Sequence, residues 1–198
     1  MHSFLETIRI ENGIACHLEY HQWRVESVFR SFNAQKKCFA LQEYIDPPEA
    51  TTLYRCRIVY TIEGIQNIEY IPYHKKTITS LYHIENPHCS YEYKYENREI
   101  LMQMFAQKGL CDDILITRNG LITDTSIANV ALFDGVEWWT PKTPLLAGTT
   151  RQRYINDGVL KTKDIPLESL HQYKKFALLN AMIDFDIIAQ ENLKDIVC

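Results

Sequence analysis

A single lysine stands in an alternating stretch, YEYKYENREI, that runs from residue 91 to residue 100. At the two-residue period of a strand, its tyrosines share one face, and Glu92, Lys94 and Glu96 share the other. Two interpretations of the lysine follow. On a solvent-exposed edge strand, a cation between two carboxylates keeps the strand from pairing with other chains and adds little stability. At the end of a strand, the same amine can react with a carbonyl group to form a Schiff base.

A second stretch, LLAGTTRQRYI at residues 145–155, combines a glycine, two hydroxyl groups and the start of a predicted helix. Gly148 permits a close backbone approach, and Thr149 and Thr150 supply the hydroxyl groups. The first turn of the helix adds free N–H groups and the positive end of the helix dipole, which together suit a phosphate or a carboxylate. The alternative is an ordinary threonine cap of a helix N-terminus, with no ligand.

Asp124 and Arg24 are polar residues whose local setting has a plain explanation. Asp124, in TDTSIAN, could bond to its own backbone in a turn, which is the more common use of such an aspartate. Arg24, one turn into a predicted helix, is typical of a solvated arginine or of one whose stem covers apolar surface. Neither residue predicts a site by itself, so the elements that would position them must be considered.

The composition limits the classes of partner. The chain has 198 residues, 46% of them hydrophobic and 23% charged, which is ordinary for a globular protein with one sizeable core or two joined lobes. Its formal net charge of −4 gives no basic surface for nucleic acid and no polybasic patch for a membrane. A small molecule or a protein is therefore the expected partner.

Several features predict a cytoplasmic protein with reduced thiols. The first residues, MHSFLETIRIENG, lack the layout of a signal peptide, and no apolar run reaches the roughly 20 residues of a membrane span. The six cysteines form no C-x-x-C pair, so the sequence predicts neither a zinc site nor a thioredoxin-type site. We expect no metal site.

The first half of the chain predicts a sheet with one helix on it. Residues 3–20 indicate two strands around an Asn-Gly turn at residues 12 and 13, the favoured hairpin dipeptide. From His21 to about Lys36 the apolar residues recur at helical spacing. After a proline pair at residues 47 and 48, three strands are expected in YRCRIVYTI, IEYIPY and TITSLYHIE.

The second half alternates short strands with helices. The stretch with Lys94 is expected to lead as a strand into a helix from about Asn97 to Lys108. Short strands follow in DDILITR, LITDT, NVALFDG and EWWTP. The last three predicted helices cover residues 149–157, 167–172 and 187–193. With no internal repeat and no linker between independent domains, the pattern indicates an α+β fold of two lobes.

Five short motifs occur in order along the chain. They are H-x-x-R from His21 to Arg24, K-x-x-N-R at Lys94, Asn97 and Arg98, T-[ED]-x-x-x-x-N at Thr123, Asp124 and Asn129, TPKTPLLAGTTR at residues 140–151, and the turn Leu179-Asn180-Ala181-Met182. Together they resemble the aminotransferase class IV family of fold-type IV pyridoxal-phosphate enzymes. This family includes branched-chain and D-amino acid aminotransferases and 4-amino-4-deoxychorismate lyase.

The resemblance implies a two-lobed, D-amino acid aminotransferase-like PLP-dependent fold that acts as one functional unit. Residues 1–90 would form a smaller N-terminal α+β lobe, and residues 91–198 a larger C-terminal, β-barrel-like lobe with helices. It also implies pyridoxal 5'-phosphate as the cofactor, a small amino-acid-like substrate and a homodimer.

The resemblance assigns the chemistry to Lys94 and Asp124. Lys94 would form the Schiff base with the cofactor and would be the catalytic residue. Asp124 would face the pyridine nitrogen, where an anion keeps that nitrogen protonated and lets the ring accept electrons. Most relatives have glutamate at this point, so the shorter aspartate needs a small backbone shift to reach the nitrogen.

Five further residues would bind the cofactor by the same resemblance. Thr149 and Thr150 would hold the phosphate with their N–H groups and hydroxyls, and Arg24 would add the planar fork of charge that phosphate favours. Leu146 would pack against the ring. Asn180 would lie in the loop that closes the phosphate site.

The resemblance leaves the reaction open. In an aminotransferase, Lys94 would move the substrate α-proton, and the amino group would pass to an oxo acid. In the lyase, related machinery expels pyruvate from aminodeoxychorismate and leaves 4-aminobenzoate, and the K-x-x-N-R motif and the N-A-M turn favour this branch. A cofactor-binding protein without turnover is the third alternative. Arg98, Arg57 and Tyr93 are candidates for the substrate carboxylate by residue type only.

The tyrosines and glutamates around Lys94 carry a further expectation. Tyr91, Tyr93 and Tyr95 should pack away from the cofactor. Carboxylates on both sides of a Schiff-base lysine would stabilise its protonated form. We therefore expect the strand to end or twist near Tyr95 and Glu96 to point away.

Overall fold

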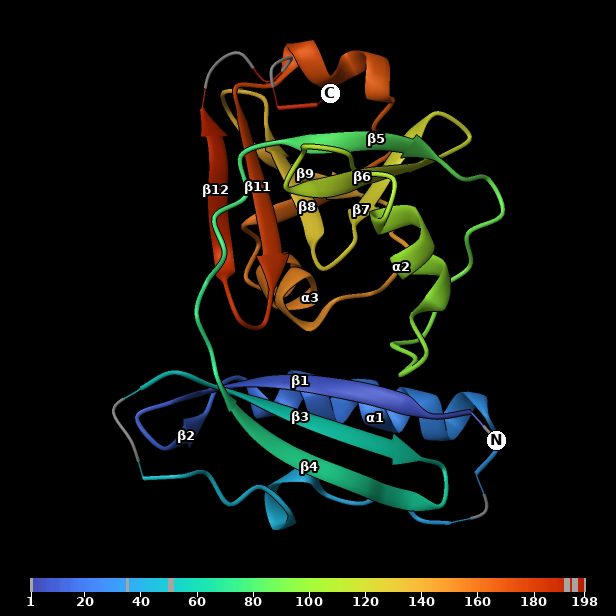
Figure 1. Cartoon of the computed structure of the whole chain (residues 1–198), viewed down its shortest axis with the longest axis vertical. Helices are drawn as coiled ribbons and strands as arrows, with labels where there is room; N and C mark the ends of the chain where they lie inside the picture. Colours follow the sequence, from blue (N-terminus) through green and yellow to red (C-terminus); the bar gives the residue numbers. More distant parts are fainter. Residues whose placement is uncertain (1, 35, 50–51, 191–192, 194–195, 198) are drawn as a thin grey trace. The chain divides into compact units, whose positions relative to one another are not determined.

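The computed structural model describes residues 2–34, 36–49, 52–190, 193 and 196–197 (Figure 1). The chain divides into two compact units, each described by itself below. Unit 1 comprises Met1–Lys75 and Tyr93–Asn97, and unit 2 comprises Lys76–Glu92 and Arg98–Cys198. The α+β class is confirmed, since both units combine helices with a sheet. The chain leaves unit 1 before the predicted boundary at residue 90 and returns to it around Lys94.

Unit 1 is built on a four-stranded antiparallel sheet. Its strands are β1 (Phe4–Glu11), β2 (Ile14–Ala15), β3 (Tyr54–Thr61) and β4 (Gly64–Pro72), in the order β2-β1-β3-β4. Asn12 and Gly13 have positive φ angles of 50° and 73°, as a two-residue hairpin of type I′ requires, so the predicted hairpin is confirmed. A short 3₁₀ helix, η1 (Leu41–Glu43), precedes β3.

Helix α1 (Leu18–Ser31) packs on one face of this sheet (Figure 1). Its Val25, Val28 and Phe29 join the buried side chains of β1 and β3 in one hydrophobic core. The burial of each such side chain contributes about 1.5–3 kcal/mol. The helix begins before the predicted start at His21, because His17 has a left-handed φ of 52° and turns the chain directly from β2 into the helix.

Unit 2 is built on an eight-stranded mixed sheet. Its strands are β5 (Leu81–Glu85), β6 (Asp113–Arg118), β7 (Leu121–Thr125), β8 (Asn129–Phe133), β9 (Trp138–Pro141), β10 (Leu160–Lys163), β11 (Lys175–Asn180) and β12 (Asp184–Gln190). The order is β10-β9-β8-β7-β6-β5, and β11 pairs with β8 and with β12. The pairs β5–β6 and β9–β10 are parallel, and the others are antiparallel. The helices are α2 (Glu99–Phe105), α3 (Thr149–Asn156) and the 3₁₀ helix η2 (Leu167–Gln172).

The largest core of unit 2 gathers side chains from distant strands. Leu81 on β5, Leu115 on β6, Val130 on β8 and Leu178 on β11 are all fully buried in it. Ile122 of β7 and Leu132 of β8 are buried in the same core, so the strands on both sides of the short loop between them are packed. No helix among the described residues is long and apolar enough to cross a membrane.

The predicted helix at residues 187–193 is wrong, because β12 extends through Gln190 and residues 191–192 lie outside the described part. Asp184 has a φ of 58° and reverses the chain after β11. Strand β12 then runs antiparallel to β11 and pairs with its backbone groups. The predicted helix near Leu167 is the 3₁₀ helix η2. The polar link expected before it contains strand β10. This strand depends on its pairing with β9, so the sequence of the link alone does not indicate it.

Candidate active site

Lys94 lies at the centre of a tight turn, so the strand expected around it is wrong. Tyr95 N donates to Tyr93 O at 2.8 Å, which closes a three-residue turn around the lysine. The remaining strand-like pairing is a single antiparallel bridge between Tyr95 and Phe4, with Leu5 N donating to Lys94 O at 2.8 Å. The turn therefore attaches the lysine backbone to the first residues of β1.

The tyrosines on either side of Lys94 pack into the core of unit 1. The ring centroids of Tyr93 and Tyr95 lie 6.2 Å and 5.5 Å from that of Phe4. Lys94 between them is half-buried. Tyr93, a candidate for the substrate carboxylate by type, is instead a member of the aromatic cluster.

Glu96 is held by other groups of unit 1. Its carboxylate accepts hydrogen bonds from Ser3 Oγ at 2.9 Å and from Arg57 Nη2 at 3.0 Å. These bonds, with the charge of Arg57, lower the pKa of Glu96. Arg57 also lies 3.6 Å from Glu69. The glutamate expected to point away from Lys94 thus has two partners of its own, and Arg57 has two carboxylates beside it.

Arg24 belongs to a buried cluster with Glu6 and His21. Arg24 Nε donates to Glu6 Oε1 at 2.7 Å, and Arg24 Nη2 donates to Glu6 Oε2 at 2.5 Å. His21 Nδ1 lies 2.6 Å from Glu6 Oε2. The exposed fractions of Glu6, His21 and Arg24 are 0%, 1% and 8%. The interpretation of Arg24 as a solvated arginine is therefore wrong.

Glu6 is a residue that the sequence prediction missed. A signal for it was present, because Glu6 alternates with Phe4, Ile8 and Ile10, whose side chains face the core. An acid on the apolar face of a strand must find a partner or lose its charge. The arginine of the H-x-x-R motif supplies that partner.

The charges of this cluster follow from its burial. Burial opposes ionisation of Glu6, but the charge of Arg24 and the hydrogen bonds from His21 and Arg24 hold the pKa of Glu6 at about 2. Burial lowers the pKa of His21, and the charges of Arg24 and Lys94 act in the same direction; together they outweigh Glu6, which raises it. At neutral pH the cluster therefore holds an anion, a neutral imidazole and a cation. Lys94 shares their electrostatic environment.

A second polar cluster lies in unit 2, around Asp124 at the end of β7. Asp124 Oδ1 accepts a hydrogen bond from Asn129 Nδ2 at 2.7 Å, and Oδ2 accepts one from Leu146 N at 2.9 Å. The carboxyl is buried, with 4% of the residue exposed. Burial raises the pKa of Asp124 to about 6, although these hydrogen bonds and the charge of Arg151 oppose the shift.

The start of α3 is joined to this carboxylate through Asn129. Asn129 Nδ2 also donates to Leu146 O at 2.8 Å, and Gly148 caps the helix two residues later. Thr149 and Thr150 form the first turn and are 6% exposed each. No described side chain caps this end of the helix. The alternative of a threonine cap is therefore wrong, and the first N–H groups of α3 suit an anion.

Arg151 and Asn180 hold the two sides of this cluster in place. Arg151 Nε donates to Thr140 Oγ1 at 3.2 Å and Nη2 donates to Pro141 O at 2.8 Å, which ties the start of α3 to the end of β9. Asn180 Oδ1 accepts from Met182 N at 2.9 Å and from Ile183 N at 3.1 Å, which shapes the turn after β11. Its Nδ2 donates to Ile127 O at 3.2 Å, in the β7–β8 loop.

The residues expected to bind the cofactor thus fall into two groups. Unit 1 holds Lys94 and Arg24. Unit 2 holds Asp124, Leu146, Thr149, Thr150 and Asn180, and the structure connects them through hydrogen bonds and the α3 turn.

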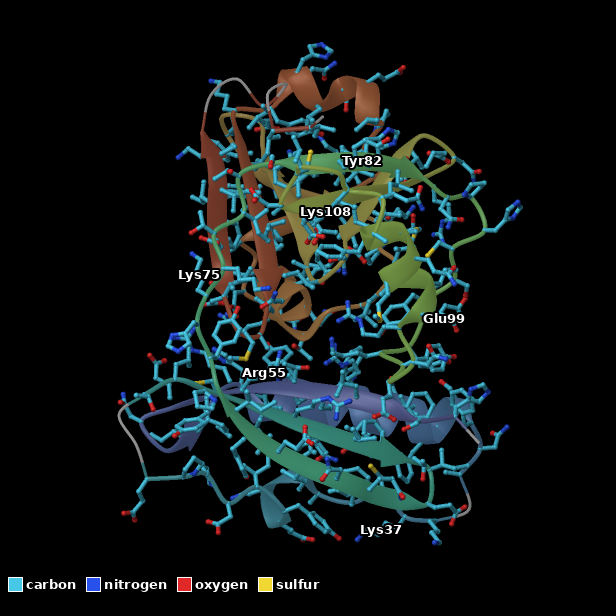
Figure 2. All side chains as sticks on the ribbon, viewed as in Figure 1. Lys37, Arg55, Lys75, Tyr82, Glu99 and Lys108 are labelled. Atoms are coloured by element: carbon cyan, nitrogen blue, oxygen red, sulfur yellow. The ribbon has the colours of Figure 1, made fainter. Side chains whose placement is uncertain are left out.

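The arginines considered for a substrate carboxylate have different settings. Arg98 lies one residue before α2. This helix begins at Glu99 (Figure 2). Arg98 Nη2 donates to Ser126 O at 2.5 Å. Arg55, not considered from the sequence, lies on β3 and alternates with the core side chains of Cys56 and Ile58 (Figure 2). Its Nε is buried and has no hydrogen-bond partner among the described residues.

The amino-transferase class IV family model matches residues 3–189. The chain belongs to the aminotransferase class IV family. An uncharacterized protein of Haemophilus influenzae is 35% identical over 186 residues, which cover 92% of this chain and 98% of that protein. The resemblance carried by the five motifs is thereby confirmed.

Solved structures of this aminotransferase class IV fold agree with the architecture. A candidate 4-amino-4-deoxychorismate lyase from Haemophilus somnus has a TM-score of 0.85 at 33% identity, covering 92% of this chain and 97% of that one. The PLP-bound form of a hypothetical aminotransferase from Mycobacterium tuberculosis has a TM-score of 0.77 at 15% identity, covering 98% and 83%. The fold-type IV architecture is therefore confirmed.

Proposed function

We propose that this class IV protein is a pyridoxal 5'-phosphate-dependent enzyme. It forms a Schiff base with an amino-acid-like substrate and transfers the amino group to an oxo acid. The observation that carries the proposal is the buried Asp124 carboxylate, bound by the backbone N–H of Leu146 just before the start of α3, where no described side chain caps the helix. One short segment of unit 2 thus joins an anion suited to a pyridine nitrogen with N–H groups suited to a phosphate.

The residues present fit this cofactor. When bound, pyridoxal 5'-phosphate supplies an aldehyde for the Schiff base and an electron-withdrawing ring. Asp124 would hold a negative charge for the ring nitrogen, and Leu146 would pack against the ring. Thr149 and Thr150 would bind the phosphate through their N–H groups and hydroxyls. Burial raises the pKa of Asp124 to about 6, so the carboxyl is mostly ionised at neutral pH, and a facing cation would favour the anion further.

Lys94 is the residue proposed for the proton transfer. With the cofactor bound, the freed amine of Lys94 would serve as the base that moves the substrate α-proton. The turn around it and the bond to Leu5 N hold its backbone in one place. Arg24 would contribute planar N–H donors to the phosphate. Asn180 would order the turn after β11 through its bonds to Met182 N and Ile183 N.

The 4-amino-4-deoxychorismate lyase reaction is the alternative, with release of pyruvate and 4-aminobenzoate. The K-x-x-N-R motif and the Asn180 turn support it, and so does the likeness to the Haemophilus somnus protein. A non-catalytic protein that binds the cofactor is a second alternative. For a substrate carboxylate, the buried Nε of Arg55 makes this residue a stronger candidate than Arg57, which has two glutamates beside it.

We also propose a homodimer located in the cytoplasm, as the family resemblance implies. Exposed apolar side chains support an assembly. Met102 on α2 is 68% exposed and Leu110, after this helix, is fully exposed. Light scattering of the purified protein tests the dimer.

Reconstitution and two assays test the function. The purified protein should bind pyridoxal 5'-phosphate and absorb near the edge of the visible range, and the variant Lys94→Ala should lose this band. A wild type that stays colourless with excess cofactor contradicts the proposal. Aminodeoxychorismate is then tested for release of pyruvate and 4-aminobenzoate, and D- and L-amino acids are tested for amino transfer to an oxo acid. Cofactor binding with activity in neither assay supports the non-catalytic alternative.

A further inference from the structure

We infer that Glu6 and His21 are positioning residues that hold Arg24 in one orientation for the phosphate of the cofactor. The inference rests on the proposed role of Arg24 and adds two residues to which no role has been given. All three side chains belong to unit 1.

The geometry of the Glu6–Arg24 pair fixes the guanidinium plane. Glu6 binds the side of the fork formed by Nε and Nη2, with one carboxylate oxygen on each nitrogen. Two parallel bonds allow the guanidinium only one plane and one direction. The other edge of the fork, which includes Nη1, is turned away from Glu6. A planar edge held in this way suits the oxygens of a phosphate.

His21 fixes the carboxylate in turn. It lies three residues before Arg24 in α1, so both side chains leave the same face of the helix. A carboxylate is only an acceptor, so the neutral imidazole must carry its proton on Nδ1 and donate it to Glu6 Oε2. Glu6 Oε2 therefore accepts from His21 and from Arg24, and the carboxylate cannot rotate without losing two hydrogen bonds.

Stability alone does not explain an acid at position 6. Glu6 faces the apolar core of unit 1 and is completely buried. Replacing a buried ion pair by apolar residues of similar size is often neutral or stabilising, because each buried charge loses its hydration. A role in orienting Arg24 gives the glutamate a function that an apolar residue could not perform.

Two ligands that differ only in the phosphate separate positioning from general stability. The full chain, freed of cofactor, is titrated with pyridoxal 5'-phosphate and with pyridoxal, which lacks the phosphate. The dissociation constant for pyridoxal divided by that for pyridoxal 5'-phosphate measures how much the phosphate contributes to binding. In Glu6→Gln this ratio should fall at least about tenfold, the loss expected for a misplaced charge-assisted hydrogen bond. Pyridoxal binding should stay within about twofold.

Matched variants complete the test. Glu63→Gln breaks an exposed ion pair with Lys36 in the same unit and should keep the wild-type ratio. In an Arg24→Gln background, Glu6→Gln should have no further effect on the ratio, since Glu6 acts through Arg24. His21→Asn, whose amide N–H can replace Nδ1–H, should keep the ratio, and His21→Leu should lower it.

The outcomes distinguish this inference from the proposed function. If Glu6→Gln weakens both ligands equally, the cluster is only structural and the inference is overturned. If Glu6→Gln does not fold, the two His21 variants decide, and equal ratios for His21→Leu and the wild type overturn it. If the wild type binds both ligands equally, the proposed role of Arg24 itself is wrong. Among the variants that keep Arg24, Glu6→Gln and His21→Leu should lose the preference for the phosphate, and Glu63→Gln and His21→Asn should keep it. This result supports the inference.

Discussion

A Cβ atom at position 148 would lie only 2.0 Å from Oδ1 of Asn129. The glycine before α3 is therefore required by space, although its φ of −70° is open to any residue. Asn129 cannot move away freely, because its Nδ2 binds both Asp124 and Leu146. Gly148 thus allows the carboxylate and the start of α3 to be joined by one amide side chain.

The first prediction concerns this contact. Gly148→Ala should displace Asn129 and weaken the binding of pyridoxal 5'-phosphate at least about tenfold, and the strain should destabilise the fold by about 1–3 kcal/mol. Cofactor titration and urea unfolding measure the two effects. The neighbouring Ala147 is exposed, so Ala147→Ser is the matched control and should change neither. Wild-type affinity in Gly148→Ala would show that Asn129 does not support the site.

The second prediction concerns the ionisation of Asp124. Burial raises the pKa of Asp124 from its ordinary 3.8 to about 6 in the cofactor-free protein. The folded state therefore binds the proton more tightly than the unfolded state. The contribution of this group to the free energy of unfolding should fall as the pH rises from about 4 to 6. The affinity for pyridoxal 5'-phosphate should rise over the same range, because the ring nitrogen requires the ionised carboxylate.

Carbon-13 NMR of the Asp124 carboxyl tests this directly. The resonance should titrate near pH 6 without cofactor and at a lower pH with it, since a facing cation favours the anion. Titration near the ordinary value in the cofactor-free protein would contradict the account.

The third prediction separates stability from function in the buried pair of unit 1. Arg24→Ala leaves Glu6 buried without its main partner and should lower the free energy of unfolding by about 3–5 kcal/mol. The double variant Glu6→Leu with Arg24→Met should recover most of this loss. Its binding of pyridoxal 5'-phosphate should nevertheless stay weak. Urea unfolding and cofactor titration measure both properties, and recovery of tight binding in the double variant would contradict a role for Arg24.

The fourth prediction concerns acid stability. The charge of Arg24 and two hydrogen-bond donors hold the pKa of Glu6 well below its ordinary 4.5, despite its burial. Its stabilising effect should be complete above about pH 4.5 and should be lost as the pH falls towards 2. Unfolding experiments between pH 3 and 7 should therefore show a weaker pH dependence for Glu6→Gln than for the wild type. Equal slopes would show that Glu6 is not ionised in the native cluster.

Local chemistry made part of the fold predictable. The turns at Asn12-Gly13 and Asn119-Gly120 have positive φ angles at both residues, and each joins two predicted strands. The motif order led to the family because the five motifs lie in order within residues 3–189, which the family model matches. These features depend on neighbours in the sequence, which a pattern can record.

The features that sequence patterns missed depend on distant partners. Strand β12 follows from a chain reversal at Asp184, and β10 follows from pairing with β9. Lys94 stands in an alternating stretch, and the two flanking tyrosines pack on the same side, against Phe4, as the alternation predicts. The hydrogen bond from Tyr95 N to Tyr93 O nevertheless makes a turn there in place of a strand. The partner of Arg24 also came from another element, since Glu6 lies on β1.

The central claim is that Lys94 carries the cofactor, and reduction with borohydride followed by peptide mass mapping tests it most directly. The protein reconstituted with pyridoxal 5'-phosphate should carry the reduced cofactor on the peptide that contains Lys94. Lys94→Arg should carry none, while Lys108→Arg, which alters a lysine bound to its own loop at Cys111 O, should be labelled like the wild type. Attachment at another lysine in the wild type, or no attachment at all, would contradict the account.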